Sequence, residues 1–358
     1  MRIALVGGAG FVGHHLALRL RQDGHDILIL DHLAVNSHVN LLEKRGGWTE
    51  HYLRFLRDRA NLWHSAGCDF ALCDATDYHR LSRRIAEWRA EAIVHLAAVA
   101  HITHTRSDQH NAFVNSILTL KNALDVAIAT NVRRLVYFSS STVYGNFRKS
   151  VVDETDDLNP DTTYGAYKLA GELFVKAAER DRGLSYTIVR PQALYGPRCV
   201  SRRVTQLFIE NALDQKPLRI DGDGSALHDF THIDDLTAGV SAIFRHFDES
   251  HNETFCLTAG RARSLRELAE IVHANIPCTI EYGSPDPEKP SRGTMSVDKA
   301  RRLLGWEPKI GLDEGMALYA DFYKEFLNAS QDSKATAVHG HMQYAEGTCE
   351  GTGKLSTG

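Results

Sequence analysis

The feature that most constrains the fold is the segment ALVGGAGFVGHHLALRL, in which an apolar run passes through three glycines into a helical pattern. Gly7, Gly10 and Gly13 have GxxGxxG spacing. A side chain at any of them would obstruct the tight turn, the close approach of a phosphate or the packing of the helix. The segment therefore predicts a strand, a tight turn and a helix whose N-terminus can bind an anion.

An acidic residue ends the second apolar run, DILILD. This residue, Asp31, stands 18 residues after Gly13. A carboxylate at this place accepts hydrogen bonds from the adenosine ribose and repels a 2′-phosphate. The glycines alone also fit a plain tight turn, but the combination indicates a dinucleotide site that favours NAD over NADP.

Short apolar runs alternate with helical segments over the first 190 residues. They are RIALV, DILILD, FALCD, AIVHLAA, RLVYFSS and SYTIVRP. This alternation predicts an α/β fold, a Rossmann-type doubly wound parallel sheet with a smaller C-terminal substrate-binding lobe. We place the NAD-binding domain over residues 1–199, with some later segments returning to it, and the lobe mainly over 200–328. An inserted helix of unassigned role is expected within 46–67, and a flexible tail over 329–358.

Charge and cysteine content restrict the partners and the compartment. The net charge is -4 and the pI is near 6.5, which gives no electrostatic footprint for nucleic acid or an anionic membrane. The six cysteines form no CxxC pair, and no apolar run approaches the length of a membrane span. We expect a cytoplasmic protein without a metal site, because the histidine cluster in AHITHTRSDQH lacks HExxH spacing and cysteine partners.

Two further stretches, STVYG and YGAYK, place hydroxyl groups before a tyrosine and a lysine. Tyr164 and Lys168 are about one helical turn apart. A phenol titrates near pH 10, so a nearby cation helps it to take a proton from an alcohol. YxxxK alone also fits a coincidental surface pair. Downstream of a dinucleotide loop, it indicates activation of a secondary alcohol for hydride transfer to a nicotinamide.

From Arg2 to Leu327 the chain resembles the extended short-chain dehydrogenase/reductase family, in its NAD-dependent epimerase/dehydratase branch. The matching motifs, in order, are GGAGFVG, LDHL, HLAA, SSSTVYG, YGAYK, YGPR, GDGSALHDFTHIDDL, SRGTMSVDKARRLLGWEP and EGM. The resemblance implies a nucleotide-sugar substrate and bound NAD. It also implies a homodimer that packs the helices near 111–130 and 163–181.

The resemblance assigns site residues position by position. The catalytic residues it implies are Ser140, Tyr164 and Lys168, with Ser139 and Ser141 mainly structural. The cofactor contacts it implies, together with Gln192 near the nicotinamide, are Gly7, Gly10, Phe11, Val12, Gly13, Asp31, His32, Asp74, Ala75, Leu96, Ala97, Ala98, Tyr164, Lys168 and a buried Asn115. The substrate contacts expected are Ser140, Ser141, Thr142, Tyr164, Arg292, His101 and His228.

The residues after Ser140 discriminate among the reactions of such enzymes. A 4,6-dehydratase needs a carboxyl pair there and a hexuronate decarboxylase typically has a glutamate, whereas this chain has Ser141 and Thr142. The pattern is similar to that of 4-epimerases, which oxidise the sugar transiently to a 4-keto form and return the hydride. Ala193 and His228 depart from the usual Asn and Arg. The alternatives are a dehydratase, decarboxylase or dehydrogenase of the same family and, from another class, a dinucleotide-sensing regulatory protein.

Overall fold

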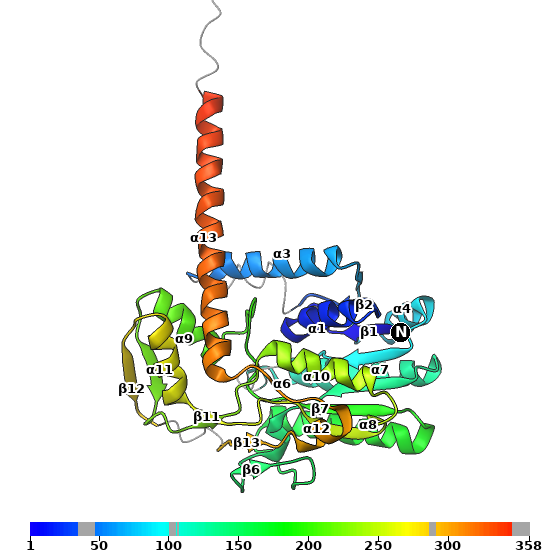
Figure 1. Cartoon of the computed structure of the whole chain (residues 1–358). Coiled ribbons are helices and arrows are strands. Elements are labelled where there is room, and N and C mark those ends of the chain that lie inside the picture. Colours follow the sequence, from blue (N-terminus) through cyan, green and yellow to red (C-terminus); the bar gives the residue numbers. More distant parts are fainter. Residues whose placement is uncertain (35–46, 100–104, 106, 286–290, 346–358) are drawn as a thin grey trace, which may run out of the picture.

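A parallel sheet of seven strands forms the centre of the molecule (Figure 1). The computed structural model describes residues 1–34, 47–99, 105, 107–285 and 291–345, with only the backbone described from residue 330 onward. The strand order is β10-β7-β5-β4-β1-β2-β3, and every neighbouring pair is parallel. The strands are β1 (Arg2–Val6), β2 (Asp26–Asp31), β3 (Asp69–Leu72), β4 (Ala92–His95), β5 (Arg134–Phe138), β7 (Tyr186–Arg190) and β10 (Glu253–Cys256).

All six strands predicted from the apolar runs are present. β4, β5 and β7 are buried at every position, as expected for a parallel sheet that helices cover on both faces. The seventh strand, β10, was not predicted, because ETFC is a short run in a region without regular alternation. It pairs with β7, so this late segment returns to the first domain.

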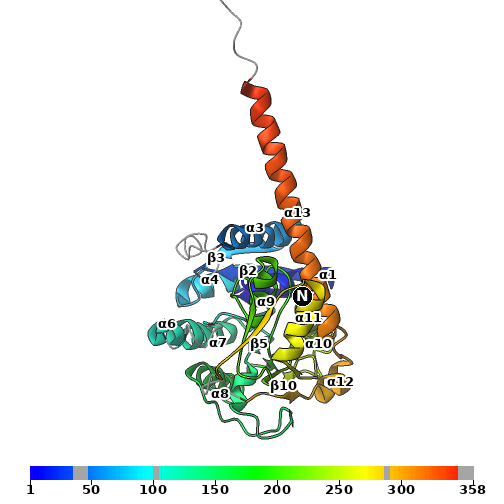
Figure 2. The ribbon, with the colours of Figure 1, turned by 90° about the vertical axis from the view of Figure 1, so that its left-hand side faces the viewer.

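Helices cover both faces of the sheet, and a separate apolar core lies under each face (Figures 1 and 2). One face carries α1 (Phe11–Gln22), α3 (Thr49–Ser65), α10 (Ile233–Arg245) and α12 (Asp298–Leu304). The other carries α4 (Tyr78–Trp88), α7 (Thr119–Ala129) and α8 (Thr163–Arg182). The short segments α6 (Gln109–Phe113) and η1 (Val114–Leu118) precede α7. The doubly wound prediction is therefore confirmed.

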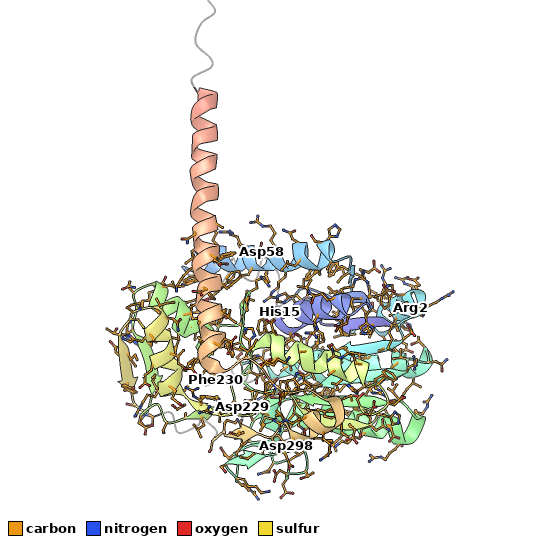
Figure 3. All side chains as sticks on the ribbon, in the orientation of Figure 1. Arg2, His15, Asp58, Asp229, Phe230 and Asp298 are labelled. Atoms are coloured by element: carbon orange, nitrogen blue, oxygen red, sulfur yellow. The ribbon has the colours of Figure 1, made fainter. Side chains whose placement is uncertain are left out.

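A third apolar core belongs to the smaller lobe. Its elements are α9 (Val204–Leu213), β8 (Leu218–Asp221), β9 (Leu227–His228), β11 (Arg263–Ser264), α11 (Leu265–Asn275) and β12 (Ile280–Gly283). The helix α11 begins with a capping box, in which Ser264 and Glu267 bond each other's backbone N–H groups. Figure 3 labels Asp229 and Phe230, which lie where the lobe meets the sheet domain.

The last helix, α13 (Leu312–Ala345), leaves the body of the molecule beside α3 (Figures 1 and 2). The sequence predicted a flexible tail from residue 329. Residues 329–345 continue α13 instead of forming an irregular chain, and their flexibility stays a prediction. Alanine, glutamine and lysine favour helix without any apolar periodicity, so the pattern gave no signal there. Residues 346–358 of the expected tail lie outside the described residues.

One stretch, Gln109–Ala129, has the length and hydropathy of a membrane span. Of this stretch, 56% is buried within the fold, where α7 covers the sheet. A core helix of a soluble protein shows the same composition, so this is weak evidence for a membrane span.

Candidate active site

The loop between β1 and α1 is packed so closely that Gly7 and Gly13 are required. A Cβ atom on Gly7 would lie 2.6 Å from the Ala97 nitrogen, and one on Gly13 would lie 2.4 Å from the Gly8 carbonyl oxygen. A Cβ on Gly10 would meet only the Gly7 oxygen, at 3.4 Å, so the space beside Gly10 is open. The first N–H groups of α1 have no intrahelical partners. The open space and these donors fit a diphosphate group.

Two carboxylates lie at the carboxyl ends of neighbouring strands. Asp31 ends β2 and accepts the N–H groups of Ala9 (3.0 Å) and Leu33 (2.7 Å), while burial raises its pKa. Asp74 follows β3 and accepts the N–H (2.9 Å) and the hydroxyl (2.8 Å) of Thr76. His32 is exposed beside Asp31. Both carboxylates are therefore at the edge of the sheet where the glycine loop lies, as predicted for an adenosine site.

The segment after β4 forms a wall against the glycine loop. Leu96 and Ala97 donate their N–H groups to the Val6 carbonyl, at 2.8 and 3.0 Å, and Ala98 follows them. The His95 ring nitrogen Nε2 lies 3.2 Å from the Thr119 hydroxyl, and burial lowers the His95 pKa to about 3. This histidine is therefore neutral at physiological pH. His101, predicted as a substrate contact after this wall, lies outside the described residues.

The prediction of a buried Asn115 is wrong, because this side chain is only half-buried. It lies in η1 and donates to the carbonyl (3.0 Å) and side-chain oxygen (2.6 Å) of Asn111, which is exposed. A different residue, Asn122, is buried and donates to the carbonyls of Ala75 (3.0 Å) and Thr76 (2.9 Å). Asn122 thus fixes the loop after β3, a role that no local sequence signal indicated.

The predicted catalytic residues come together at the ends of β5 and α8. The Ser140 hydroxyl accepts the Thr142 N–H at 3.2 Å, which caps the short helix η2 (Ser141–Tyr144). The Ser140 side chain also acts to lower the pKa of the Tyr164 phenol. The Lys168 ammonium lies 5.9 Å from the centre of the Tyr164 ring and donates to the Phe138 carbonyl at 2.7 Å. The hydroxyl, phenol and ammonium predicted from the two motifs are therefore in one place.

Burial dominates the ionisation of these groups. It raises the pKa of Tyr164, while the charge of Arg203 and the hydrogen bond from Ser140 oppose this increase. It lowers the pKa of Lys168 to about 8, opposed by the charge of Glu172. Arg203 immediately precedes α9 of the lobe, and its buried Nε has no hydrogen-bond partner among the described residues. The sequence analysis missed Arg203, because no local spacing connects it with Tyr164.

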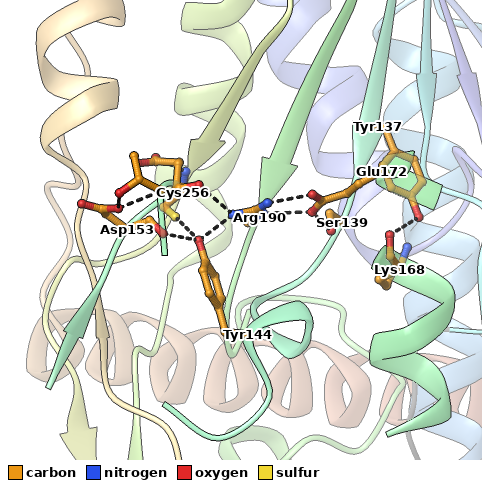
Figure 4. Close-up of polar contacts among 10 residues, drawn as sticks. Tyr137, Ser139, Tyr144, Asp153, Lys168, Glu172, Arg190 and Cys256 are labelled. Atoms are coloured by element: carbon orange, nitrogen blue, oxygen red, sulfur yellow. Dashed lines mark hydrogen bonds and ion pairs between the residues drawn. The ribbon is translucent and has the colours of Figure 1, made fainter. Parts of the chain in front are cut away.

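A buried ion pair supports the catalytic residues from within the sheet domain (Figure 4). Arg190 donates to both carboxylate oxygens of Glu172, at 2.9 and 2.7 Å, and to the Tyr144 phenol oxygen at 2.8 Å. Ser139 donates to Glu172 at 2.5 Å, and Tyr144 donates to the Asp153 carbonyl at 2.8 Å. This network connects η2, α8 and β7, so the elements that carry Ser140 and Tyr164 are held together.

Other polar atoms near these elements are buried with no hydrogen-bond partner in the described part of the chain. They include the Thr142 hydroxyl, both amide atoms of Gln192 and one terminal nitrogen of Arg292. The other terminal nitrogen of Arg292 donates to the Gly145 carbonyl at the end of STVYG, and burial lowers the pKa of this guanidinium. Because buried polar groups are normally paired, these atoms fit a polar ligand.

Two predicted substrate residues have less direct support. The Ser141 side chain is buried, and its N–H donates to the Pro191 carbonyl at 3.0 Å, which fits the structural role also expected for it. His228 lies in β9, opposite Arg263 of β11, with its ring 5.5 Å from that of Phe230. The contact of each with substrate stays a prediction.

Comparisons with known proteins agree with this geometry. The chain is 29% identical over 332 residues to the UDP-glucose 4-epimerase of Mycolicibacterium smegmatis, covering 90% of this chain and 99% of that protein. It is 26% identical over 348 residues to UDP-glucuronic acid decarboxylase 4 of Arabidopsis thaliana, covering 94% and 72%. The crystal structure of the UDP-glucose 4-epimerase of Thermotoga maritima with UDP-glucose has a TM-score of 0.79 at 25% identity, covering 91% of this chain and 100% of that one.

The family of the chain follows from a match that spans most of it. The sequence profile of the NAD dependent epimerase/dehydratase family matches residues 3–257. The relatives include epimerases and decarboxylases, so the match identifies the family and not one reaction. This protein therefore belongs to the NAD dependent epimerase/dehydratase family, as an enzyme whose cofactor is NAD.

Proposed function

We propose that this enzyme is a nucleotide-sugar 4-epimerase. The observation that carries the proposal is the pair Ser141 and Thr142, which follows Ser140 in η2 and supplies no carboxyl group. Loss of water from the oxidised sugar needs an acid and a base at this place. Epimerisation needs only reversible oxidation at C4 and one proton acceptor. The residues present therefore suffice for epimerisation and lack what a dehydratase uses.

Each catalytic side chain has a role in this proposal. Tyr164 accepts the proton of the sugar 4-hydroxyl and later returns it, and Ser140 hydrogen-bonds the same oxygen. NAD, when bound, supplies the reversible acceptor for the hydride of C4. Burial raises the pKa of Tyr164 and thereby disfavours the phenolate that the reaction needs. The positive charges of Arg203 and Lys168 act in the opposite direction and favour this phenolate.

The substrate and cofactor contacts extend the same proposal. We assign Arg292 to the nucleotide part of the substrate, Thr142 to the sugar and Gln192 to the nicotinamide carboxamide. Each has a buried polar atom without a hydrogen-bond partner among the described residues. The five described cysteines are free thiols, which supports a cytoplasmic location.

A nucleotide hexuronate is a second candidate substrate, and its decarboxylation a second candidate reaction. The observation that favours it is the buried Nε of Arg203, the cation that acts on Tyr164, which has no hydrogen-bond partner among the described residues. An arginine fork binds a carboxylate more strongly than a neutral hydroxyl. The Arabidopsis relative is a UDP-glucuronic acid decarboxylase.

The test is incubation of the purified full chain, without added cofactor, with UDP-, GDP-, dTDP- and CDP-sugars, including uronic acids. Products are identified by mass spectrometry and proton NMR. A product of unchanged mass with inverted C4 supports the epimerase. Loss of water or carbon dioxide contradicts it in favour of a dehydratase or decarboxylase, and NAD binding without any turnover would favour a dinucleotide sensor.

We also propose a homodimer that packs α6, α7 and α8 against a second copy. Phe113, Leu173 and Phe174 are 48%, 58% and 45% exposed, and the Tyr167 ring lies 6.1 Å from that of Phe113. Exposed large apolar side chains on neighbouring helices are typical of a protein interface. Light scattering after size exclusion should give the mass of two chains for the native protein and of one for Leu173→Glu. A native monomer would contradict the proposal.

A further inference from the structure

The inserted helix α3 carries a buried arginine to the glycine loop. We propose that Arg59 is a positioning residue, which fixes the turn that binds the cofactor diphosphate and joins it to the loop leading into the lobe. Its side chain is 1% exposed. One terminal nitrogen donates to the Ala9 carbonyl at 3.3 Å, while Nε and the other terminal nitrogen donate to the Arg198 carbonyl at 3.2 and 2.5 Å. Figure 3 labels the preceding residue, Asp58, on α3 above His15 of α1.

Ala9 is held at both of its backbone groups. Its N–H donates to the Asp31 carboxylate at 3.0 Å, and its carbonyl accepts from Arg59. Ala9 directly precedes Gly10, beside which the open space for a diphosphate lies. A peptide group fixed from both sides keeps the first donors of α1 in the geometry for binding, so less ordering is needed when the cofactor arrives.

The Arg59 guanidinium also places a positive charge beside the N-terminus of α1. Burial lowers the pKa of Arg59 to about 10, opposed in part by the charge of Asp31, so the side chain stays protonated at neutral pH. A positive charge beside the N-terminus of a helix adds to the field of the helix dipole there. Both effects act first on the diphosphate. The charge of Arg59 also lowers the pKa of Asp31, so the adenosine contacts should change, but less.

The N-terminal half of α3 attaches to the lobe and to α13. The Tyr52 hydroxyl donates to Glu210 of α9 at 2.7 Å, and Glu210 also accepts from Tyr323 of α13 at 2.9 Å. The Phe55 ring lies 4.6 Å from the Phe326 ring. The helix α3 therefore contacts the cofactor loop, and Arg198 just before the lobe, through Arg59. It contacts the lobe itself through its N-terminal half. The inserted segment thus links the two halves of the site.

The test compares two ligands on NAD-stripped, full-length protein by calorimetry: ADP-ribose, which carries the diphosphate, and adenosine, which does not. Arg59→Met should weaken ADP-ribose binding about tenfold and adenosine binding clearly less. It should also retain less NAD through purification. The matched control is Arg54→Met on the same helix, where Arg54 lies over the Phe326 ring and away from the loop. That variant should bind both ligands like the native chain.

Arg59→Lys covers the case in which the methionine variant does not fold. A lysine keeps the charge but cannot donate to both carbonyls, so we expect a loss of about threefold for ADP-ribose and none for adenosine. Equal losses for both ligands would indicate a merely structural role and overturn the proposal. So would native ADP-ribose affinity in a folded variant. These measurements need no sugar substrate, so they do not depend on the proposed epimerase reaction.

Discussion

The two sides of the site differ in how their polar groups are satisfied. On the sheet domain, Lys168 donates to the Phe138 carbonyl and Ser140 accepts from the backbone of η2. On the opposite side, Arg203 and Arg292 each keep a buried nitrogen with no hydrogen-bond partner among the described residues. The chain itself therefore pairs Lys168 and Ser140, whereas the two arginines keep donor capacity that a ligand can use. Asp161 lies 3.9 Å from the Arg292 nitrogen as an ion-pair partner. The Thr142 hydroxyl and the Gln192 amide on the sheet side also keep capacity for a ligand.

Because the two sides of the site differ in this way, substitutions on them should have different effects on the kinetics. Groups that act only on the reacting atoms lower kcat when removed, while groups that bind a remote part of the substrate raise KM. We therefore expect the sheet side to control turnover and stability, and the arginine side to control affinity and pH dependence.

The largest effect is expected for Tyr164→Phe, which removes only the phenol hydroxyl. Without a proton acceptor, kcat should fall about a thousandfold or more, while NAD binding stays nearly unchanged. Turnover is measured by NMR and NAD content by absorbance after denaturation. Tyr167→Phe is the matched control on the same helix and should keep native kcat, because its ring packs on Phe113. Native activity in Tyr164→Phe would refute the assigned mechanism.

The next effect concerns the network beneath the catalytic residues. Glu172→Gln leaves the buried guanidinium of Arg190 without its counter-charge, so the free energy of unfolding should fall by about 3–5 kcal/mol. Urea denaturation measures this loss. The control is Lys121→Gln, which breaks an exposed ion pair with Asp125 and should not change stability measurably. Equal stability of Glu172→Gln and the native chain would show that this network does not hold the sheet side together.

The sequence indicated the sheet side from its motifs and Arg292 from the resemblance, but it did not indicate Arg59 or Arg203, for a physical reason. The glycine turn, Asp31 and the pair Tyr164 and Lys168 are set by local spacing along single strands and helices. Arg59 and Arg203 act through contacts between segments far apart in the chain, and no periodicity encodes those.

Two errors have different origins. The resemblance implied a buried Asn115, but this residue of η1 is half-buried and donates to the exposed Asn111. The strand β10 was missed because its four residues are too few for a strand signal of their own, and they form a strand by pairing with β7. Patterns along the chain thus predicted the elements better than their partners.

A smaller effect is expected on the arginine side for Arg292→Met. If this guanidinium binds the nucleotide part of the substrate, its loss should raise KM about tenfold and change kcat little. Steady-state kinetics with the substrate found in the panel measures both. Arg219→Met is the control, since that arginine is exposed on β8 of the same lobe. A fall in kcat with unchanged KM would place Arg292 among the catalytic groups and weaken the contrast between the two sides.

The smallest expected effect is a shift of the pH profile in Arg203→Gln. The charge of Arg203 lowers the pKa of Tyr164 against the increase caused by burial, so removing that charge should raise the Tyr164 pKa further. Less phenolate is then present at a given pH, and the rising limb of kcat/KM should move to higher pH, by about one unit or less. Arg202→Gln, at the exposed neighbouring position, should leave the profile in place. A shift to lower pH would mean that Arg203 does not stabilise the phenolate, and the two sides of the site would then be electrostatically independent.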